Sequence, residues 1–335
     1  MKTPRLRRNA SLALTLLLIA GLSACDAELQ DSPEAMSLTA RGATEVMPED
    51  AIAVGMIDLK SLAANPLTTP FGEAGFFTSH LQGEARARFD DFTAATGLDP
   101  ETDLSEVYAG LVAVEGQNQH PAVNFAIYGT FDREALQNFV ESRLGSDLTQ
   151  RDYAGVTVFE KAGEHGGIAF ALASDQMIVA ASGYQDVTAM LDRLQGQGTS
   201  IADNKDMMAR IARAAAAGDV WGVALKPSEM TAPSGSEAIE NQLGRLVTAV
   251  QAAGGALDVQ PASMATTMQI YPSDGVSADD LASLVRGAIA MARAQDGLDD
   301  DKRSMLDDVK VAVERDYVTV RFEAPNAFFE SMAKN

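Results

Sequence analysis

The sequence predicts an α+β protein with antiparallel or mixed sheets, helices packed on one face of them, and a diverged internal duplication. Three observations support this prediction. Alternating apolar runs are joined by short turns, most clearly in residues 309–322, where valines alternate on both sides of the turn Glu314-Arg315-Asp316. Stretches with apolar residues at three- and four-residue spacing, typical of helices, separate these runs. The hairpins exclude a doubly wound parallel sheet, in which strands and helices alternate.

The first α+β half, residues 47–200, contains most of the predicted hairpins. Strands are expected at residues 51–59, 107–114, 123–131, 156–161, 168–173 and 177–181, and helices at 81–97, 132–144 and 187–194. Gly97 is placed to end the first of these helices, and Asp132 to cap the second. In residues 168–173 large side chains alternate with alanines. We therefore expect one face of that strand to fill a core and the other to let an element pack closely.

The second α+β half, residues 201–335, repeats this order. It predicts helices at 207–217, 239–250, 281–292 and 326–333, strands at 220–225 and 264–271, and the hairpin at 309–322. Ser277 and Asp280 form a capping-box pattern before the third helix. Both halves then run strand, long helix, strand, helix, hairpin, helix. Leu98-Asp99 and Leu257-Asp258 occupy matching places in this alignment, which indicates an internal duplication.

Residues 1–24 are predicted to be a secretory signal peptide. Basic residues open the chain, an apolar run follows at residues 11–22, and small residues close it. The apolar run is shorter than the roughly 20 residues that span a bilayer. The closing tetrapeptide Leu22-Ser23-Ala24-Cys25 resembles the lipobox of bacterial lipoproteins. This resemblance implies cleavage before Cys25, a diacylglyceryl group on its sulfur and acylation of the new amino terminus.

The position after the lipidated cysteine is occupied by Asp26, which resembles the inner-membrane retention signal of enterobacterial lipoproteins. The resemblance places the chain in the cell envelope, anchored by lipid and facing the periplasm, with the inner membrane favoured over the outer. Two or three acyl chains anchor a protein stably, whereas one does so only marginally. Residues 25–46 are then the lipidated cysteine and a polar tether.

The charge of the chain excludes nucleic acid as a partner. There are 26 Lys and Arg residues against 47 Asp and Glu, a formal charge of −21, whereas phosphate binding needs clustered basic residues. Removing residues 1–24 takes away four basic side chains and no acidic one, which makes the formal charge −25. Anionic headgroups repel such a surface, so we expect the body to stand off the membrane.

Two further motifs resemble an uncharacterised family of bacterial secreted and lipid-anchored proteins. The first is an opening Pro-x-Asp-Ala followed by Asp-Leu, matched by Pro48, Asp50 and Ala51 and then by Asp58-Leu59. The second is Thr-Gly-Leu-Asp-Pro-x-x-Asp-Leu, matched by residues 96–104. The resemblance covers residues 47–225. It implies no known activity and transfers no catalytic residue.

Catalytic motifs are missing from the sequence, so we expect a protein that is not an enzyme and has no cofactor. The pattern Gly-x-Ser-x-Gly is absent, and the single cysteine is expected to carry lipid. His80, His120 and His165 lie far apart and form no metal-binding pair. Methionines such as Met264 and Met268 fit core positions of predicted elements. A hydrolase would need a cluster of Ser, Asp or Glu that the sequence does not reveal.

An acidic loop is the one candidate for a metal ion. Asp296, Asp299, Asp300 and Asp301 place four carboxylates within six residues, and Ca²⁺ prefers such oxygen ligands. The loop does not match an EF-hand, because its glycine is misplaced and no Glu closes it. A solvated acidic loop before a helix gives the same pattern. We therefore expect no metal, with calcium as the minor alternative.

Two functions remain open for the predicted body. The first is a non-enzymatic, lipid-anchored envelope protein that binds a partner protein or supports an envelope assembly. The second is a periplasmic carrier or binding protein for an apolar ligand or peptide. An apolar pocket of several hundred Å³ favours the carrier. A flat apolar patch favours a protein partner.

Overall fold

The computed structural model describes residues 38–64, 82–114, 121–144, 148–163, 167–226, 244–260, 262–294, 303 and 306–325. These residues divide between Ala212 and Arg213 into two compact units, called here the N-terminal unit (residues 38–212) and the C-terminal unit (residues 213–325). Each unit contains helices and an antiparallel sheet. The predicted α+β class is therefore confirmed. No described helix has the length and apolarity needed to span a membrane.

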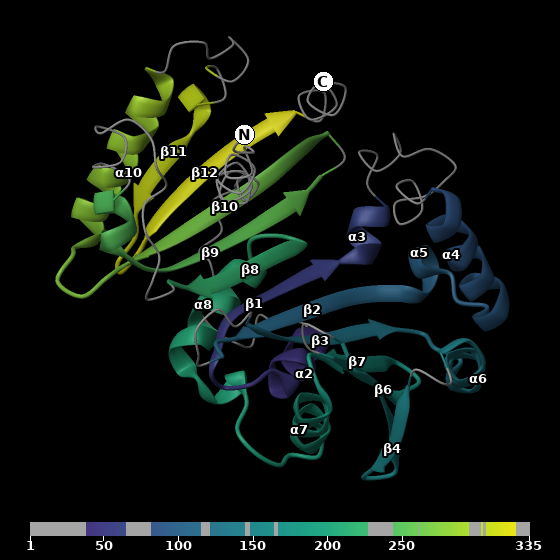
Figure 1. Cartoon of the computed structure of the whole chain (residues 1–335). Helices are drawn as coiled ribbons and strands as arrows, with labels where there is room; N and C mark the ends of the chain where they lie inside the picture. The colour runs from purple at the N-terminus through teal and green to yellow at the C-terminus, as the bar shows by residue number, and fades with distance from the viewer. Residues whose placement is uncertain are drawn as a thin grey trace, which may run out of the picture. The chain divides into compact units, whose positions relative to one another are not determined.

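The N-terminal unit contains a seven-stranded sheet in the order β1-β2-β3-β7-β6-β5-β4 (Figure 1). Every neighbouring pair in this sheet is antiparallel. The strands are β1 (Ala51–Asp58), β2 (Leu104–Val112), β3 (Ala122–Gly129), β4 (Thr149–Tyr153), β5 (Val156–Lys161), β6 (Ile168–Ser174) and β7 (Met177–Ala181). The helices are α2 (Leu38–Val46), α3 (Leu59–Ala63), α4 (Gly83–Thr96), α5 (Pro100–Asp103), α6 (Arg133–Leu144) and α7 (Tyr184–Leu194). A 3-10 turn, η4 (Ile201–Asp203), leads to α8 (Lys205–Ala215), within which the units divide.

The C-terminal unit contains a five-stranded sheet in the order β8-β9-β10-β12-β11, again antiparallel throughout. The strands are β8 (Val220–Leu225), β9 (Val250–Val259), β10 (Ser263–Pro272), β11 (Lys310–Val313) and β12 (Val318–Pro325). Helix α10 (Ala278–Arg293) joins β10 to β11 and packs on the sheet beside them (Figure 1). Ser277 caps α10, because its hydroxyl accepts from the backbone N–H of Asp280 at 3.1 Å.

The two sheets share one connectivity. In each, three strands pair in chain order, a helix follows the third strand (α6 or α10), and the last strand returns beside the third. A hairpin partner then lies beyond that last strand, β6 beside β7 and β11 beside β12. The N-terminal unit differs by the extra strands β4 and β5 at its edge. This common strand order supports the predicted internal duplication.

One detail of the predicted alignment is wrong. Leu98 and Asp99 lie between α4 and α5, before β2, whereas Leu257 and Asp258 lie inside β9. The strand order instead makes β2 the counterpart of β9. Two strands also differ from the predicted pattern. β4 was not predicted, because its sequence is polar throughout, and Val250 begins β9 instead of ending a helix.

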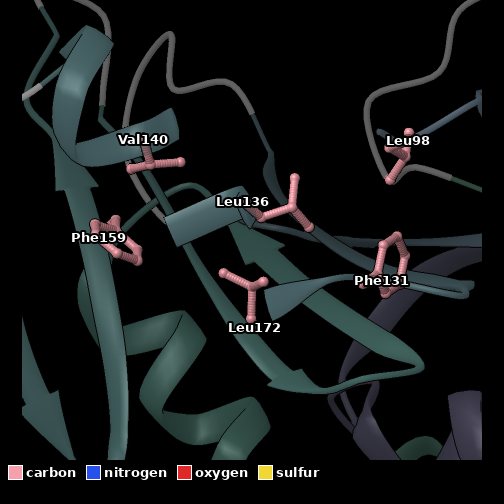
Figure 2. Close-up of a cluster of buried hydrophobic side chains, with 6 residues drawn as sticks. All are labelled: Leu98, Phe131, Leu136, Val140, Phe159 and Leu172. Carbon is pink, nitrogen blue, oxygen red and sulfur yellow. The ribbon is translucent and has the colours of Figure 1, made fainter. Parts of the chain in front are cut away.

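The core of the N-terminal sheet lies on the face that we call the α6 face, which carries Ile127, Phe159, Phe170, Leu172 and Ile178. Its central cluster comprises Leu98, Phe131, Leu136, Val140, Phe159 and Leu172, and Figure 2 shows these side chains around α6. Asp132 begins this helix as predicted, its carboxylate accepting from the N–H of Ala135 at 3.0 Å. Gly97 ends α4 in the left-handed conformation.

The opposite face of the same sheet, called the α2 face, is also covered. The alanines of β6 point to it, and Ala169 and Ala171 are fully buried where α7 packs on β5, β6 and β7. A Cβ on Gly110 would lie 2.8 Å from the sulfur of Met47, just after α2. The described helices thus lie on both faces, unlike the one-sided packing expected. Both faces of the sheet are mainly apolar, so each is stable only when other elements pack on it and exclude water.

Candidate binding surfaces

The predicted site residues lie outside the part of the chain that the structure describes. This holds for the lipidation site Cys25 and the sorting residue Asp26. It also holds for the acidic loop with Asp296, Asp299, Asp300 and Asp301, and for His80, His120 and His165. Within the described residues, no three His, Cys, Asp or Glu side chains gather as they would around a metal ion. The described parts of the sheets therefore supply the candidate surfaces.

The α6 face of the N-terminal sheet has apolar rows that extend over as many as six strands, from β1 to β5 in sheet order. One row in register runs through Ile57, Val107, Ile127 and Ile178, and the next runs through Gly55, Ala109, Phe125, Ala180, Phe170 and Phe159. A third row begins with Ala53, Leu111 and Val123. A face without a polar side chain in its first two rows needs an apolar partner.

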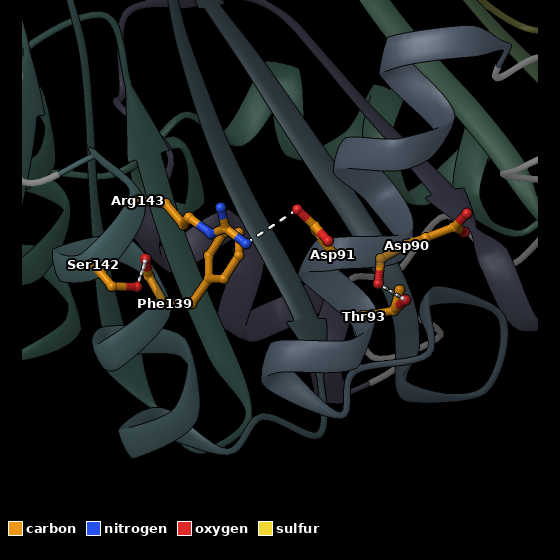
Figure 3. A network of polar contacts seen from close by, with 6 residues as sticks. All are labelled: Asp90, Asp91, Thr93, Phe139, Ser142 and Arg143. Atoms are coloured by element: carbon orange, nitrogen blue, oxygen red, sulfur yellow. Dashed lines mark hydrogen bonds and ion pairs between the residues drawn. The ribbon is translucent and has the colours of Figure 1, made fainter.

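Helices α4 and α6 cover only part of this face. Phe92 on α4 and Phe139 on α6 meet edge to face at 5.2 Å between ring centres. Arg143 on α6 also reaches Asp91 on α4 at 3.0 Å (Figure 3). Ile57 on β1 and Ile168 on β6 lie outside their cluster and are 40% and 52% exposed. Interaction surfaces are marked by contiguous apolar patches, to which an exposed apolar side chain contributes when apolar neighbours surround it.

Over α6, on its outer side, there is a depression of about 380 Å³. Its lining is polar, formed by Arg133, Glu134, Gln137 and Asn138. Ligand cavities for apolar molecules are lined mainly by hydrophobic side chains. This depression is therefore not the cavity that a carrier of apolar ligands would need.

A tyrosine cluster lies on the α2 face. Tyr108 donates to a carboxylate oxygen of Glu106 at 2.6 Å, and its ring meets Tyr128 edge to face at 5.8 Å. The Tyr128 hydroxyl is buried and has no hydrogen-bond partner among the described residues. Burial, reinforced by the charges of Glu106 and Glu45, raises the pKa of Tyr128. The phenol therefore stays neutral at neutral pH and is unsuited to act as a base.

The face of the C-terminal sheet opposite α10 is called here the α8 face. Arg213, near the end of α8, lies over the rings of Tyr317 and Tyr271 at 4.8 and 5.8 Å, and those rings are 5.5 Å apart. Its guanidinium also reaches Asp316 at 3.5 Å. Cation–π contacts of this kind stabilise a buried arginine. The cluster joins α8 to the sheet and is structural.

Next to this cluster the α8 face is polar although it is buried. Thr267 and Gln269 of β10 are 2% and 1% exposed, and Thr319 of β12 is buried beside them. The sequence analysis missed these residues because β9 was not recognised as a strand. The available signal was the alternation in residues 264–271, where Thr267, Gln269 and Tyr271 share a face opposite Met268 and Ile270.

Comparison with known proteins gives a fold likeness only. No protein-family profile matches the chain, and no curated protein matches it. Among solved structures, crystal forms III, I and IV of TP0453 are similar, with TM-scores of 0.47, 0.44 and 0.45. They are 13%, 12% and 13% identical, and the match covers 87% of this chain and 96%, 95% and 96% of theirs. A likeness at this level says nothing about what the chain binds.

Proposed function

We propose that this chain is a non-enzymatic, lipid-anchored protein of the cell envelope that binds a partner protein through the α6 face of its N-terminal sheet. Cys25 carries the lipid and the body faces the periplasm, with Asp26 favouring the inner membrane. The tether expected over residues 26–46 is shorter, because α2 (Leu38–Val46) is a helix whose Ala43 and Val46 are buried in the N-terminal unit; we place the tether before α2. The observation that supports the proposal best is the exposure of Ile57 and Ile168 on a face whose central rows are apolar, with Lys161 in register beside Ile168.

A protein partner fits this face better than an enclosed ligand. The exposed isoleucines stand on β1 and β6, which are four strands apart in the sheet, or about 19 Å at a strand spacing of 4.8 Å. Fully burying an isoleucine contributes about 1.5–3 kcal/mol, so covering the exposed part of each adds about 1 kcal/mol. A partner that reaches both gains from each of them, whereas a small ligand covers one.

Photo-crosslinking in intact cells tests this proposal. A photoreactive phenylalanine analogue is placed at Ile57, at Ile168 or at Leu194, a control on α7 that is 39% exposed, close to the 40% of Ile57. The proposal predicts that Ile57 and Ile168 capture the same envelope protein and that Leu194 does not. It is contradicted if all three positions capture the same proteins, or if neither isoleucine captures a protein.

The carrier is kept as a second candidate, because one observation favours it. In the C-terminal unit the Oγ1 of Thr266, the Oγ1 of Thr267 and the Nε2 of Gln269 are buried without a hydrogen-bond partner among the described residues, and such groups can bind the polar end of a ligand.

A further inference from the structure

Residues 38–50 form a strap across the α2 face of the N-terminal sheet. The strap consists of α2 and the turn that leads from it into β1. Helix α2 packs on α7, η4 and β3 (Figure 1), and its side of the contact is apolar, with Ala43, Val46 and Met47 fully buried. The Met47 sulfur lies 2.8 Å from the place that a Cβ on Gly110 would take. A short apolar contact therefore docks the strap.

Hydrogen bonds hold the carboxyl end of the strap. The guanidinium of Arg193, on α7, donates from Nη1 to the carbonyl oxygen of Val46 and from Nε to that of Thr199, each at 3.0 Å. The N–H of Ile201 donates to the carbonyl oxygen of Met47 at 2.9 Å. Because Arg193 binds both the strap and the segment before η4, it clamps this end of the strap to the body.

The middle of α2 covers a group that is unfavourable to bury. A Cβ on Gly42 would lie 3.1 Å from the Tyr128 hydroxyl, so the helix backbone passes close to that oxygen. The hydroxyl is buried and has no hydrogen-bond partner among the described residues. A buried hydroxyl without a partner destabilises the state that buries it, and water reaches this one when α2 lifts. The docked strap thus carries a free-energy penalty that opening removes.

A lifted strap is not expected to stay helical. Helix α2 has nine residues, and isolated helices shorter than about 12–15 residues are marginal in water. Segments with few buried contacts open locally while the rest of a domain stays folded. The strap therefore has two states, one docked and helical and the other released and unfolded.

Release of the strap changes the length of chain between the body and Cys25. With α2 docked, 12 residues (26–37) separate Cys25 from the body. With the strap released, 25 residues (26–50) separate them. At about 3.4 Å per extended residue, the maximum reach rises from about 40 Å to about 85 Å.

We propose that the strap is a releasable element that sets how far the lipid-anchored body stands from its membrane. Arg193 favours the docked state, and the Tyr128 hydroxyl favours the released one. Release doubles the reach of the body while β2 and β3 stay folded. The stand-off role rests on the proposed lipid anchor at Cys25, whereas the opening itself does not, and neither depends on the α6 face.

Hydrogen exchange read by mass spectrometry tests the opening. It uses the full chain, lipidated and held in zwitterionic lipid nanodiscs. The amides of residues 43–47 and of Ile201 should exchange together, and faster than those of β2 and β3. Arg193→Gln should speed this exchange about tenfold, because it removes a hydrogen bond from a charged donor. The matched control Arg143→Gln removes an arginine from α6, on the opposite face, and should leave the exchange unchanged.

A second variant tests the part that Tyr128 plays. Tyr128→Phe should slow exchange of the strap amides about fivefold, because opening then no longer hydrates a buried hydroxyl. Unchanged strap exchange in this variant overturns the proposal, since the hydroxyl would stay buried when the strap opens. Strap amides that exchange only together with β2 and β3 also overturn it. If Arg193→Gln unfolds the whole unit, Tyr128→Phe still decides.

Energy transfer tests the stand-off. A donor dye is attached at Gln150→Cys, an exposed position on the edge strand β4, and an acceptor-labelled lipid is included in the nanodisc. Transfer should fall in Arg193→Gln and stay at the wild-type level in Arg143→Gln. Equal transfer in both, with the strap open by exchange, overturns the proposal. A chain that leaves the nanodisc contradicts the lipid anchor and with it the stand-off role, and exchange in solution then decides the opening alone.

Discussion

Removing one oxygen atom from each of two neighbouring tyrosines is expected to change stability in opposite directions. Tyr108 donates to Glu106 at 2.6 Å, whereas the Tyr128 hydroxyl is buried without a partner among the described residues. An unsatisfied buried hydroxyl costs about 1–3 kcal/mol. The space of one oxygen atom costs a few tenths of a kcal/mol, at about 24 cal/mol per Å³. Tyr128→Phe should therefore stabilise the fold by about 1 kcal/mol.

Tyr108→Phe should destabilise the fold by about 1.5–3 kcal/mol, because it removes a hydrogen bond to a carboxylate. Urea unfolding followed by circular dichroism measures both changes, with the wild type as reference. A gain of about 1 kcal/mol corresponds to a rise in Tm of about 2–4 °C for a unit of this size. If Tyr128→Phe loses as much stability as Tyr108→Phe, the Tyr128 hydroxyl has a partner and the reasoning fails.

The same hydroxyl gives a prediction on pH. Burial raises the pKa of Tyr128 above that of a tyrosine in the unfolded chain, which is about 10. The neutral form is favoured in the fold, so this contribution is fully present below pH 10 and declines as pH rises above it. The stability advantage of Tyr128→Phe should thus widen above pH 10. An advantage that stays constant or narrows would contradict the assignment.

Three further changes test other parts of the account. Gly129→Ala should lower the free energy of unfolding by about 1–3 kcal/mol or more in urea. Its Cβ would lie 2.5 Å from the carbonyl oxygen of Asp103, and this oxygen cannot move freely because it accepts a hydrogen bond from the N–H of Thr130. Wild-type stability in this variant would refute the packing. Cys25→Ser should abolish labelling of the chain by radioactive palmitate, and retained label would exclude Cys25 as the acylated residue. Millimolar Ca²⁺ should leave the Tm unchanged, and a rise would restore the acidic loop as a calcium site.

Much of the fold was predictable because local patterns and tertiary packing agree. The alternating valines around residue 314 form the hairpin of β11 and β12, and Asp132 and Ser277 begin their helices as capping predicts. β9 was missed because alanine and glycine have low strand propensity. Its small residues are needed by Gln269, which lies across Gly254, and no single-strand pattern reveals such a neighbour.

The candidate surfaces were less predictable than the fold. Ile57 and Ile168 belong to strands that a local pattern identifies, but their common face depends on the strand order β1-β2-β3-β7-β6. In the sequence, Thr267 and Gln269 have the pattern of ordinary strand residues. Their burial becomes clear only from the pairing of β10 with β9 on one side and β12 on the other. Both surfaces therefore depend on pairings between segments distant in sequence, which residue periodicity does not encode.

The affinity for the captured envelope protein tests the central claim most directly. Once crosslinking identifies that partner, its binding to the lipidated chain is measured for Ile57→Asp, Ile168→Asp and the matched control Leu194→Asp. A charge at either isoleucine should weaken binding at least tenfold, because desolvating an unpaired carboxylate in an apolar contact is strongly unfavourable. The control should bind as the wild type does. Wild-type affinity in both isoleucine variants, with the partner still bound, would contradict the assignment of the α6 face as the binding surface.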